Sequence, residues 1–392
     1  MNSYALVLAG GGAKGAYQLG AWKALREIGI TFNAIAGTSI GSINGALIAS
    51  DDYEKALEMW NNVSVEKGIR LSGELPDSEN LFSKKNWGVL FKEFILKGGF
   101  DASPTAEFIS DYIDEEKIRS RNIPFYIMTV QMTQGVTPRE ISLAEIPEGE
   151  LIDYLMASSN IPLATGIGPE GEKFLDGGVY DNVPVMPLKK RGYNKFIVLD
   201  ISNIKGFAHS MDLLNSQLVY IRPYDAEMLG ASFDFDPETN EKRILMGYLD
   251  AKKAFSFLLG KIYYFEPDVF RFMANKYGPD TLMHLEELAY ALKVEPCRIY
   301  DEWEFLQALR AAYETEKSRL EEAEKEETKD SDKEKDKDKE KEKESDFEIF
   351  RNAIKKRFSH KSPLEEHETA VKVLEELFGE KKPSTELTEI TS

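Results

Sequence analysis

Cysteine and histidine are scarce in this chain. Its 392 residues include one cysteine, Cys297, and four histidines. A single cysteine excludes an intramolecular disulfide and leaves no cluster of thiols to hold zinc. The composition therefore favours a protein of a reducing compartment, and we expect neither a metal site nor a cofactor.

Long apolar runs and positive charge are scarce as well. No apolar run approaches the about 20 residues that cross a bilayer, and the N-terminal residues have neither the basic segment nor the cleavage site of a secretory signal. We therefore expect a cytoplasmic protein, with peripheral contact to a membrane left open. The formal net charge of -19 argues against nucleic acid as the main partner, because phosphate backbones are bound by positive surfaces.

The most informative stretch places one serine between two glycines where a strand meets a helix. Residues 32–36 are short and apolar, as in a buried strand, and residues 40–49 are small and aliphatic, as in a packed helix. In the G-T-S-I-G turn between them, Ser39 takes a strained, exposed position that Gly37 and Gly41 make sterically possible. The positive end of the helix favours an oxyanion there. The pattern indicates a nucleophilic serine, and an ordinary turn that contains serine is the alternative.

A second glycine motif, G-G-G-A-K-G at residues 10–15, follows a predicted strand at residues 4–9 and precedes a predicted helix at residues 16–28. This order gives a right-handed crossover between parallel strands. Two chemistries use such a loop. Its G-x-G-x-x-G spacing is that of a dinucleotide site. Alternatively, its backbone N–H groups form an oxyanion hole for acyl transfer. The donors are then Gly10, Gly11 and Gly12.

The second strand decides between these chemistries. A dinucleotide site has an acidic residue near the end of that strand, which binds the ribose hydroxyls. Here the strand ends in Ala36, Gly37 and Thr38 and runs into the serine turn. Two glycine motifs at adjacent strand ends favour acyl transfer, and a dinucleotide-binding enzyme becomes the least favoured alternative.

The histidines are poorly placed to serve as the base that a serine nucleophile needs. His360 and His367 lie in or beyond a charged tail, and His284 lies in an amphipathic helical stretch. His209 follows the serine in the chain order of a hydrolase triad. However, no recognisable motif surrounds it, so a histidine base is not favoured.

A carboxylate is the better candidate for the base. The stretch F-L-D-G-G places Asp176 after a short apolar strand. Because Gly177 and Gly178 carry no side chains, the carboxylate can approach Ser39 closely. The alternative is a tight turn in which Asp176 caps its own backbone.

The three motifs together resemble those of the patatin-like phospholipase family, the bacterial-type acyl hydrolases. G-G-G-A-K-G is similar to the family's oxyanion-hole motif, G-T-S-I-G to its nucleophile elbow, and D-G-G to the block that supplies the aspartate of its Ser-Asp dyad. Further matches are A-S-S-N-I-P at residues 157–162 and Y-D-N-V-P at residues 180–184. The resemblance covers residues 2–258, and the order and spacing of the motifs are those of the family.

This resemblance implies that Ser39 attacks the carbonyl carbon of a lipid ester, that Asp176 accepts its proton, and that the glycine loop binds the oxyanion. Water then hydrolyses the acyl-enzyme, and no cofactor takes part. Lys14 either shapes the loop, contacts a substrate phosphate or is solvated. The glycines that support the motifs are Gly15, Gly37, Gly41, Gly177 and Gly178.

Strands and helices alternate along the first part of the chain. Beyond the serine turn, the sequence predicts helices at residues 51–63 and 148–158, and strands at residues 125–131 and 195–200. Such alternation predicts a mostly parallel sheet covered on both faces, with ligands at the carboxyl ends of the strands. The expected fold is therefore a three-layer α/β/α fold, patatin-like by the resemblance, with a C-terminal helical extension.

Between the serine turn and the aspartate, residues 81–100 repeat aromatic and aliphatic side chains at helical spacing among lysines. An apolar face of this kind could form a lid or a surface that contacts a membrane. An ordinary helix packed on the core is the favoured alternative.

The composition changes beyond residue 258. Residues 314–346 are nearly all Glu, Lys and Asp, and we interpret them as a linker or as a solvent-exposed helix that continues the preceding one. Amphipathic spacing returns beyond them, so that segment must dock on the catalytic domain, a second copy of the chain, a membrane or an unknown partner. The predicted division is catalytic domain 1–258, helical extension 259–313, charged linker 314–346, amphipathic helical segment 347–380 and disordered tail 381–392.

The sequence thus supports two functions. The favoured one is hydrolysis of fatty-acyl esters of lipids, with phospholipids implied by the resemblance. The alternative is a weakly active or gated relative that binds lipid as a regulatory module. The expected partner is a lipid ester, and the C-terminal helices leave self-association or an unknown partner open.

Overall fold

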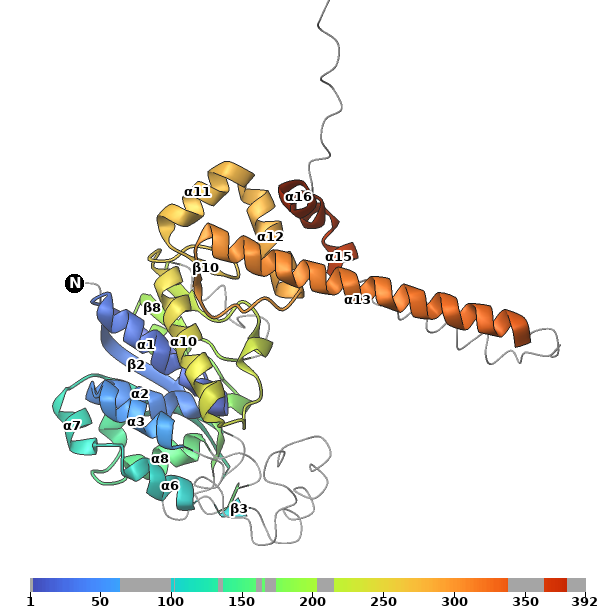
Figure 1. The fold of residues 1–392 in the computed structure, drawn as a ribbon. Coiled ribbons are helices and arrows are strands. Elements are labelled where there is room, and N and C mark those ends of the chain that lie inside the picture. Colours follow the sequence, from blue (N-terminus) through green and yellow to red (C-terminus); the bar gives the residue numbers. More distant parts are fainter. Residues whose placement is uncertain are drawn as a thin grey trace, which may run out of the picture. The chain divides into compact units, whose positions relative to one another are not determined.

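The structure, a computed structural model, describes residues 3–63, 100–101, 103–132, 137–159, 164–165, 174–202, 215–337 and 363–378. The chain forms two compact units, residues 1–256 and residues 257–392 (Figure 1). The first unit ends close to the predicted end of the catalytic domain. Several predicted features lie outside the described residues: the lid or helix up to residue 99, His209, His360, residues 338–362 and residues 379–392.

A seven-stranded sheet forms the centre of the first unit. Its strand order is β5-β4-β2-β1-β8-β9, and β7 pairs with β4. Two strands, β5 (Thr137–Ser142) and β7 (Phe174–Asp176), are antiparallel to β4. The parallel strands are β1 (Ser3–Leu8), β2 (Thr31–Thr38), β4 (Phe125–Gln131), β8 (Lys195–Leu199) and β9 (Gln217–Ile221). The predicted mostly parallel sheet is confirmed.

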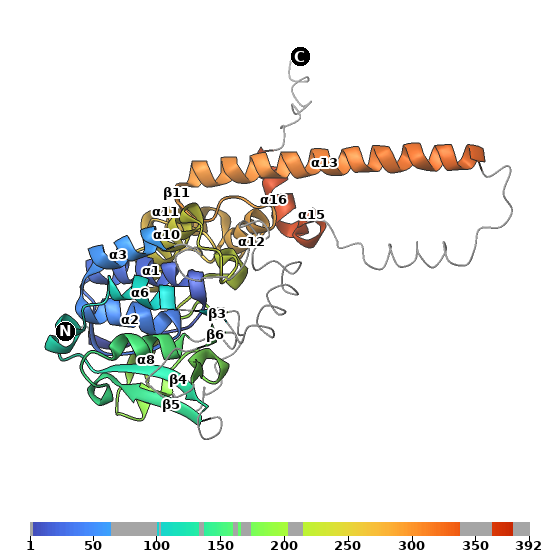
Figure 2. The same ribbon diagram turned by 90° about the horizontal axis from the view of Figure 1, so that it is seen from below.

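Helices cover both faces of this sheet (Figures 1 and 2). On one face, alternate residues of β1, β2 and β8 pack against Leu188 of α9 (Met186–Lys189). On the opposite face, Ile35 and Phe125 lie against Gly45 of α2 (Ile40–Ser50), where an added Cβ would be 2.8 Å from the Phe125 ring. Because residues alternate between the two faces of a strand, both faces are apolar and covered. The three-layer α/β/α architecture is confirmed.

The remaining elements of the first unit are helices, short 3-10 turns and a second, two-stranded sheet. The helix α10 (Pro237–Ala254) starts with the residues that favour a helix N-terminus. Its first residue is a proline, and Asp236 before it caps the helix by accepting the N–H of Thr239 at 2.9 Å. A small two-stranded sheet joins β3 (Phe100–Asp101) to β6 (Ala164–Thr165). The other helices are α1 (Ala16–Glu27), α3 (Tyr53–Asn62), α6 (Ser103–Ser110), α7 (Glu115–Ser120), α8 (Leu151–Ser158) and α10 (Pro237–Ala254). Short 3-10 turns are η1 (Gly12–Gly15), η3 (Leu143–Glu145), η4 (Gly177–Val179) and η5 (Ala226–Leu229).

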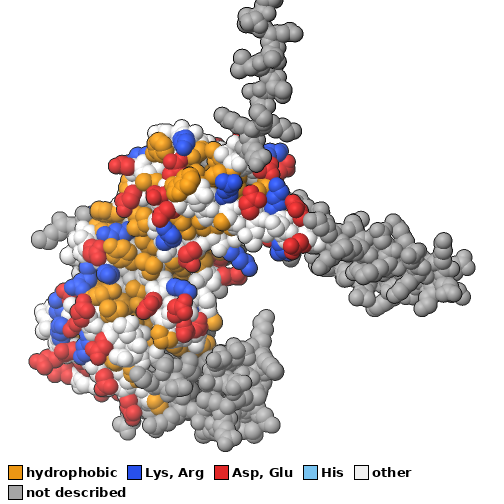
Figure 3. Space-filling model, in the orientation of Figure 1, with side chains coloured by type: hydrophobic (Ala, Val, Ile, Leu, Met, Phe, Trp, Pro, Cys, Tyr) orange, Lys and Arg blue, Asp and Glu red, His pale blue; other side chains and the backbone are white. Residues whose placement is uncertain are grey.

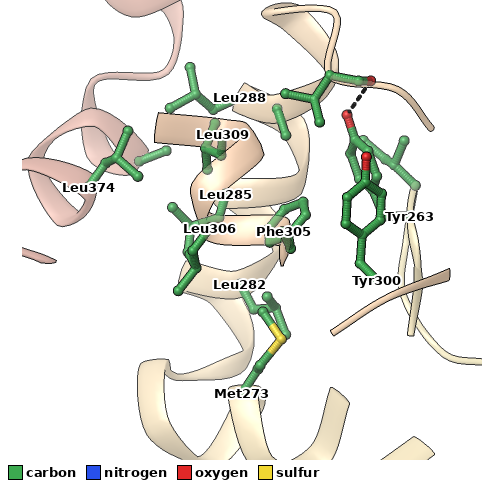
Figure 4. Close-up of a cluster of buried hydrophobic side chains, with 14 of the residues drawn as sticks. Tyr263, Met273, Leu282, Leu285, Leu288, Tyr300, Phe305, Leu306, Leu309 and Leu374 are labelled. Atoms are coloured by element: carbon green, nitrogen blue, oxygen red, sulfur yellow. Dashed lines mark hydrogen bonds between the residues drawn. The ribbon is translucent and has the colours of Figure 1, made fainter. Parts of the chain in front are cut away.

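The second unit has its own apolar core (Figure 4). Tyr263, Phe305 and Leu285 are fully buried in it, and Tyr263 donates its hydroxyl hydrogen to the carbonyl of Val294 at 3.0 Å. Its elements are α11 (Pro267–Tyr277), α12 (Pro279–Ala291), α13 (Glu302–Lys337), α15 (Pro363–Glu366), α16 (Glu368–Phe378) and the paired strands β10 (Tyr264–Phe265) and β11 (Ile299–Tyr300).

Two of the open alternatives concern segments that the structure describes in part. The charged stretch is helical as far as Lys337, because α13 continues through it (Figure 2). The amphipathic α16 docks within the second unit: Leu374 is buried in the core, and Tyr313 of α13 donates its hydroxyl hydrogen to Glu375 at 2.6 Å. The described part of the amphipathic segment, residues 363–378, therefore has a docking surface inside its own unit.

Acidic and basic side chains are interspersed over the described surface that Figure 3 shows. That face carries no large patch of one sign among the described residues. The net charge of -19 is thus not gathered at one place on it. No helix in the described ranges combines the length and the apolar character that crossing a membrane requires.

Candidate active site

Ser39 occupies the turn between β2 and α2. Its backbone angles are φ 55° and ψ -130°, which non-glycine residues seldom adopt. The two glycines of the turn lie against other backbone: a Cβ on Gly37 would be 2.3 Å from the oxygen of Gly41, and a Cβ on Gly41 would be 2.4 Å from the oxygen of Leu8. Strain of this kind costs about 1–3 kcal/mol and persists only where surrounding contacts hold it.

The pairing of β4 brings Asp176 to Ser39. One edge of β4 pairs with β5, and the other edge is shared, because β2 pairs with its first part and β7 with its last part. Thr38 lies opposite Met128, and Asp176 lies opposite Thr129, so the ends of β2 and β7 meet at consecutive residues of β4. Ser39 follows Thr38 directly, and its side chain is close enough to the Asp176 carboxyl to lower the pKa of that carboxyl.

Asp176 is held in its turn by a backbone hydrogen bond. Its Oδ1 accepts the N–H of Gly178 at 2.7 Å. The tight turn and the position beside Ser39, which the sequence presents as alternatives, therefore coexist. Burial raises the pKa of Asp176 above its ordinary value, and the N–H of Gly178 and the side chain of Ser39 lower it by less. A carboxylate with a raised pKa is a stronger base.

The glycine loop passes directly beside Ser39. A Cβ on Gly10 would be 3.1 Å from Cβ of Ser39 and 2.6 Å from Oδ1 of Asn182. Asn182 donates from Nδ2 to the oxygen of Gly10 at 3.1 Å, and Gly10 donates its N–H to the backbone oxygen of Asn182 at 3.3 Å. Thr38 also donates its hydroxyl hydrogen to the oxygen of Asp181 at 2.9 Å. The chain after the D-G-G turn thus joins the glycine loop to the serine turn.

Two N–H groups of the loop donate no hydrogen bond to the described residues. Within the described part of the chain, Gly11 and Gly12 donate no hydrogen bond, whereas the N–H of Gly10 is engaged by Asn182. Gly12 has φ 60°, and a Cβ on it would be 2.2 Å from the oxygen of Ser232. The arrangement can stabilise an oxyanion that develops next to the serine.

The buried Arg243 holds the loop that supports the glycine loop. It is 1% exposed and donates from Nε to the oxygen of Leu229 at 2.8 Å and from Nη2 to the oxygen of Ala231 at 3.0 Å. Ser232, which follows, accepts the N–H of Ala13 at 2.7 Å. Arg243 also donates from Nη1 to the oxygen of Ala13 at 3.4 Å, so it contacts the glycine loop directly as well as through residues 229–232.

Lys14 and Gly15 form the last part of the glycine loop, after Gly10, Gly11 and Gly12. Lys14 is 5% exposed, so the solvated interpretation is wrong, and burial together with Arg243 lowers the pKa of Lys14. This burial favours a role in shaping the loop. A Cβ on Gly15 would be 2.6 Å from Cγ1 of Ile40, which shows how closely the start of α1 approaches α2.

A connected set of buried polar side chains holds the glycine loop at both of its ends. Gln18 donates from Nε2 to the oxygen of Ala9 at 2.8 Å. Asn44 donates from Nδ2 to the oxygen of Gly15 at 3.0 Å and to Oε1 of Gln18 at 2.9 Å, and its Oδ1 accepts the ring N–H of Trp60 at 3.0 Å. These contacts fix both ends of the glycine loop.

Replacing Asn44 by alanine is expected to destabilise the protein. The change leaves the ring N–H of Trp60 and Oε1 of Gln18 without this partner, and each buried polar group left unsatisfied costs about 1–3 kcal/mol. Chemical denaturation measures the loss in the free energy of unfolding. Asn62→Ala is the matched control, because Asn62 is partly exposed and donates to the hydroxyl of Tyr112 at 3.2 Å. Equal losses in the free energy of unfolding of Asn44→Ala and Asn62→Ala would contradict the structural role assigned to Asn44.

Some of these residues had no sequence signal for their roles. Asn182 lies in the motif Y-D-N-V-P, and Ser158, which accepts the N–H of Ser39, lies in the motif A-S-S-N-I-P. Nothing in these two motifs indicates a supporting role for either residue. Asn44 and Arg243 act across long sequence separations, so only the fold reveals them. Among the histidines, His284 contacts Glu287 at 3.3 Å in the second unit.

A family model described as patatin-like phospholipase matches residues 6–189. This range includes the glycine loop, the serine turn and the D-G-G turn.

Curated relatives match about half of the chain. Lysophospholipase NTE1 from Candida glabrata is 29% identical over 200 residues, which are 51% of this chain and 10% of that protein. Lysophospholipase NTE1 from Kluyveromyces lactis is 31% identical over 200 residues, which are 51% of this chain and 12% of that protein. Patatin-like phospholipase domain-containing protein 7 from Rattus norvegicus is 26% identical over 208 residues, which are 52% of this chain and 14% of that protein. The chain thus spans between 10% and 14% of the length of these relatives.

Solved structures give weaker similarities. VipD from Legionella pneumophila has a TM-score of 0.37 and 13% identity, over 96% of this chain and 85% of that chain. Full-length ExoU in complex with SpcU from Pseudomonas aeruginosa gives a TM-score of 0.30 and 16% identity, over 79% of this chain and 67% of that chain.

Proposed function

Because residues 6–189 belong to the patatin-like phospholipase family, we propose that the protein is a serine acyl hydrolase that cleaves fatty-acyl esters of lipids. Ser39 is the nucleophile, and Asp176 is the general base. The observation that carries the proposal is the placement of Ser39, at a strained strand-to-helix turn, beside Asp176, because β2 and β7 end at consecutive residues of β4. The glycine loop beside them supplies the oxyanion hole.

The first half of the reaction transfers the acyl group to the enzyme. Asp176 accepts the hydroxyl proton of Ser39 while Oγ attacks the ester carbonyl carbon, and the carbonyl electrons move to oxygen. The N–H groups of Gly11 and Gly12 stabilise this oxyanion, with Gly10 contributing if its bond to Asn182 is shared. When the intermediate collapses, the alcohol leaves with the proton from Asp176, and the acyl group stays on Ser39.

The second half releases the fatty acid. Water attacks the acyl carbonyl carbon, and Asp176 accepts a proton from that water. The same N–H groups stabilise the second oxyanion. The collapse breaks the bond to Oγ, Ser39 regains its proton from Asp176, and a fatty acid leaves.

The proposed substrate is the acyl ester of a phospholipid or a lysophospholipid. The family description and the names of the lysophospholipase relatives support this choice. Such substrates are held in bilayers or micelles, so the protein acts in peripheral contact with a lipid surface.

Release of fatty acid from defined lipids tests this function. Wild-type protein and Ser39→Ala are incubated with vesicles of phosphatidylcholine and with lysophosphatidylcholine, and the free fatty acid is measured by mass spectrometry. Wild type is expected to release fatty acid from one or both lipids, and Ser39→Ala to stay at the background rate. Equal release by both proteins would contradict the assignment of Ser39.

The raised pKa of Asp176 predicts that activity falls on the acid side of the pH profile at a higher pH than for an ordinary aspartate. Asp176 must be ionised to accept a proton, and burial raises its pKa. Activity is therefore fully present above the raised pKa and is lost as the pH falls through it. The measurement is kcat/KM for a soluble ester against pH, over the range in which the circular dichroism of the protein is unchanged. An acid limb in the ordinary range of exposed aspartates would contradict this prediction.

A further inference from the structure

The strained backbone of Ser39 is held by a side chain from another element. Ser158 lies at the end of α8 and is completely buried. Its Oγ accepts the N–H of Ser39 at 2.9 Å, and its hydroxyl donates to the carbonyl oxygen of Met128 at 2.6 Å. The hydroxyl thus bridges the serine turn and β4.

The carbonyl group of Met128, which accepts the hydroxyl of Ser158, lies against the turn that contains Asp176, the proposed base. A Cβ on Gly177 would be 2.3 Å from the oxygen of Met128. Gly177 directly follows Asp176, and Asp176 pairs with Thr129, the next residue of β4. One hydroxyl therefore links the backbone of Ser39 to the backbone beside Asp176.

The end of α8 is itself fixed to the same strand. Thr129 donates its hydroxyl hydrogen to the oxygen of Ala157 at 3.0 Å. Both the residue before Ser158 and Ser158 itself are thus bonded to β4, so the position of the Ser158 hydroxyl follows that of the strand.

The two sides of Ser39 differ in how they are held. Its carbonyl oxygen accepts the N–H of Ser42 at 2.8 Å and the hydroxyl of Ser42 at 2.7 Å, so it has more than one donor. Among the described residues, its N–H has the hydroxyl of Ser158 as its acceptor. A strained residue relaxes where its restraint is removed, and the N–H group of Ser39 has one hydrogen bond among the described residues.

We propose that Ser158 is a positioning residue that fixes Ser39 against Asp176. The inference rests on the proposed function, and it adds a residue that does not touch the substrate. Replacing Ser158 by alanine removes the bridge, and Ser39 then leaves its position beside Asp176. A shift of about 1 Å at a reacting group can cost about 100-fold in rate.

The variant Ser158→Ala is therefore expected to lower kcat about 10- to 100-fold, with KM within about threefold. The acid limb of its pH profile is expected to move to higher pH, because the nearby side chain of Ser39 lowers the pKa of Asp176 and this effect weakens when Ser39 moves away. A role in stability alone would leave the acid limb in place.

Ser50→Ala is the matched control. Ser50 is also a buried serine at the end of a helix, and its hydroxyl donates to the oxygen of Leu47 at 2.8 Å within α2. It makes no contact with Ser39 among the described residues. The control is expected to keep the kcat and the acid limb of the wild type. Ser158→Cys, which keeps the size of the side chain but hydrogen-bonds weakly, replaces Ser158→Ala if that variant does not fold.

Hydrogen exchange gives a readout that does not depend on activity. In full-length protein, the peptide that contains Ser39 is expected to exchange faster in the Ser158 variant than in wild type and Ser50→Ala. Faster exchange there, with a lower kcat and a shifted acid limb, supports the proposal. Unchanged exchange at Ser39, or a kcat and acid limb equal to those of Ser50→Ala, overturns it. If wild type does not turn over lipid, the proposed function fails, and the exchange data still decide whether Ser158 holds Ser39.

Discussion

Replacing Asp176 by asparagine is expected to lower kcat about 100- to 10,000-fold, the range over which a general base contributes. The side chain keeps its size and can still accept the N–H of Gly178, so the turn is preserved. It can no longer take the proton of Ser39. Steady-state hydrolysis of a soluble ester measures the loss, and KM is expected to change little.

The stability of the same variant gives an internal check. Burial raises the pKa of Asp176 in the folded protein, so ionisation of this group at neutral pH opposes folding. The melting temperature of Asp176→Asn at neutral pH is therefore expected to be no lower than that of wild type. Asp114→Asn is a matched control, because Asp114 caps α7 by accepting the N–H of Lys117 at 2.9 Å, and asparagine caps equally well. A variant Asp176→Asn as active as Asp114→Asn would contradict the role of Asp176.

Replacing Gly12 by alanine is expected to lower kcat about 100- to 1,000-fold, which is the effect of losing one oxyanion-hole donor. Gly12 has φ 60°, and the added Cβ would be 2.2 Å from the backbone oxygen of Ser232. Because neither backbone can yield easily, the loop must move, and the N–H groups of Gly11 and Gly12 move with it. Single-turnover acylation by a soluble ester reports the loss.

The chain offers a matched control for the strain itself. Gly29 has φ 80°, and no atom lies within 4 Å of an added Cβ. Gly29→Ala therefore introduces the same unfavourable backbone angle with no clash and no effect on the loop. It is expected to lose stability by about 1 kcal/mol and to keep its kcat. Equal kcat values for Gly12→Ala and Gly29→Ala would exclude an oxyanion hole in this loop.

The fold was largely predictable where one element follows the next. The strand at Phe125–Gln131 has the predicted bounds, and β1, the glycine loop, α1 and β2 follow in the predicted order. Apolar runs of strand length and small-residue helices are local signals, so they can be read directly. The charged stretch before Lys337 was ambiguous, because composition alone does not distinguish a linker from a solvent-exposed helix.

The supports of the site were not predictable for the opposite reason. Ser158 is 119 positions from Ser39, and Asn182 is 172 positions from Gly10. Their contacts depend on one edge of β4, which pairs with β2 along its first part and with β7 along its last part. No local sequence pattern indicates this change of pairing partner. Motifs identified the side chains to which we assign the chemistry, whereas the residues that hold them became visible only in three dimensions.

Covalent labelling of Ser39 tests the central claim most directly. Wild type, Ser39→Ala and Asp176→Asn are treated with a fluorophosphonate, and the adduct is located by intact mass and peptide mapping. The account predicts a single adduct on Ser39 in wild type, no adduct in Ser39→Ala, and slow labelling in Asp176→Asn. A folded wild-type protein that takes up no label at Ser39 would contradict the account, and the regulatory, lipid-binding function would then be the better description.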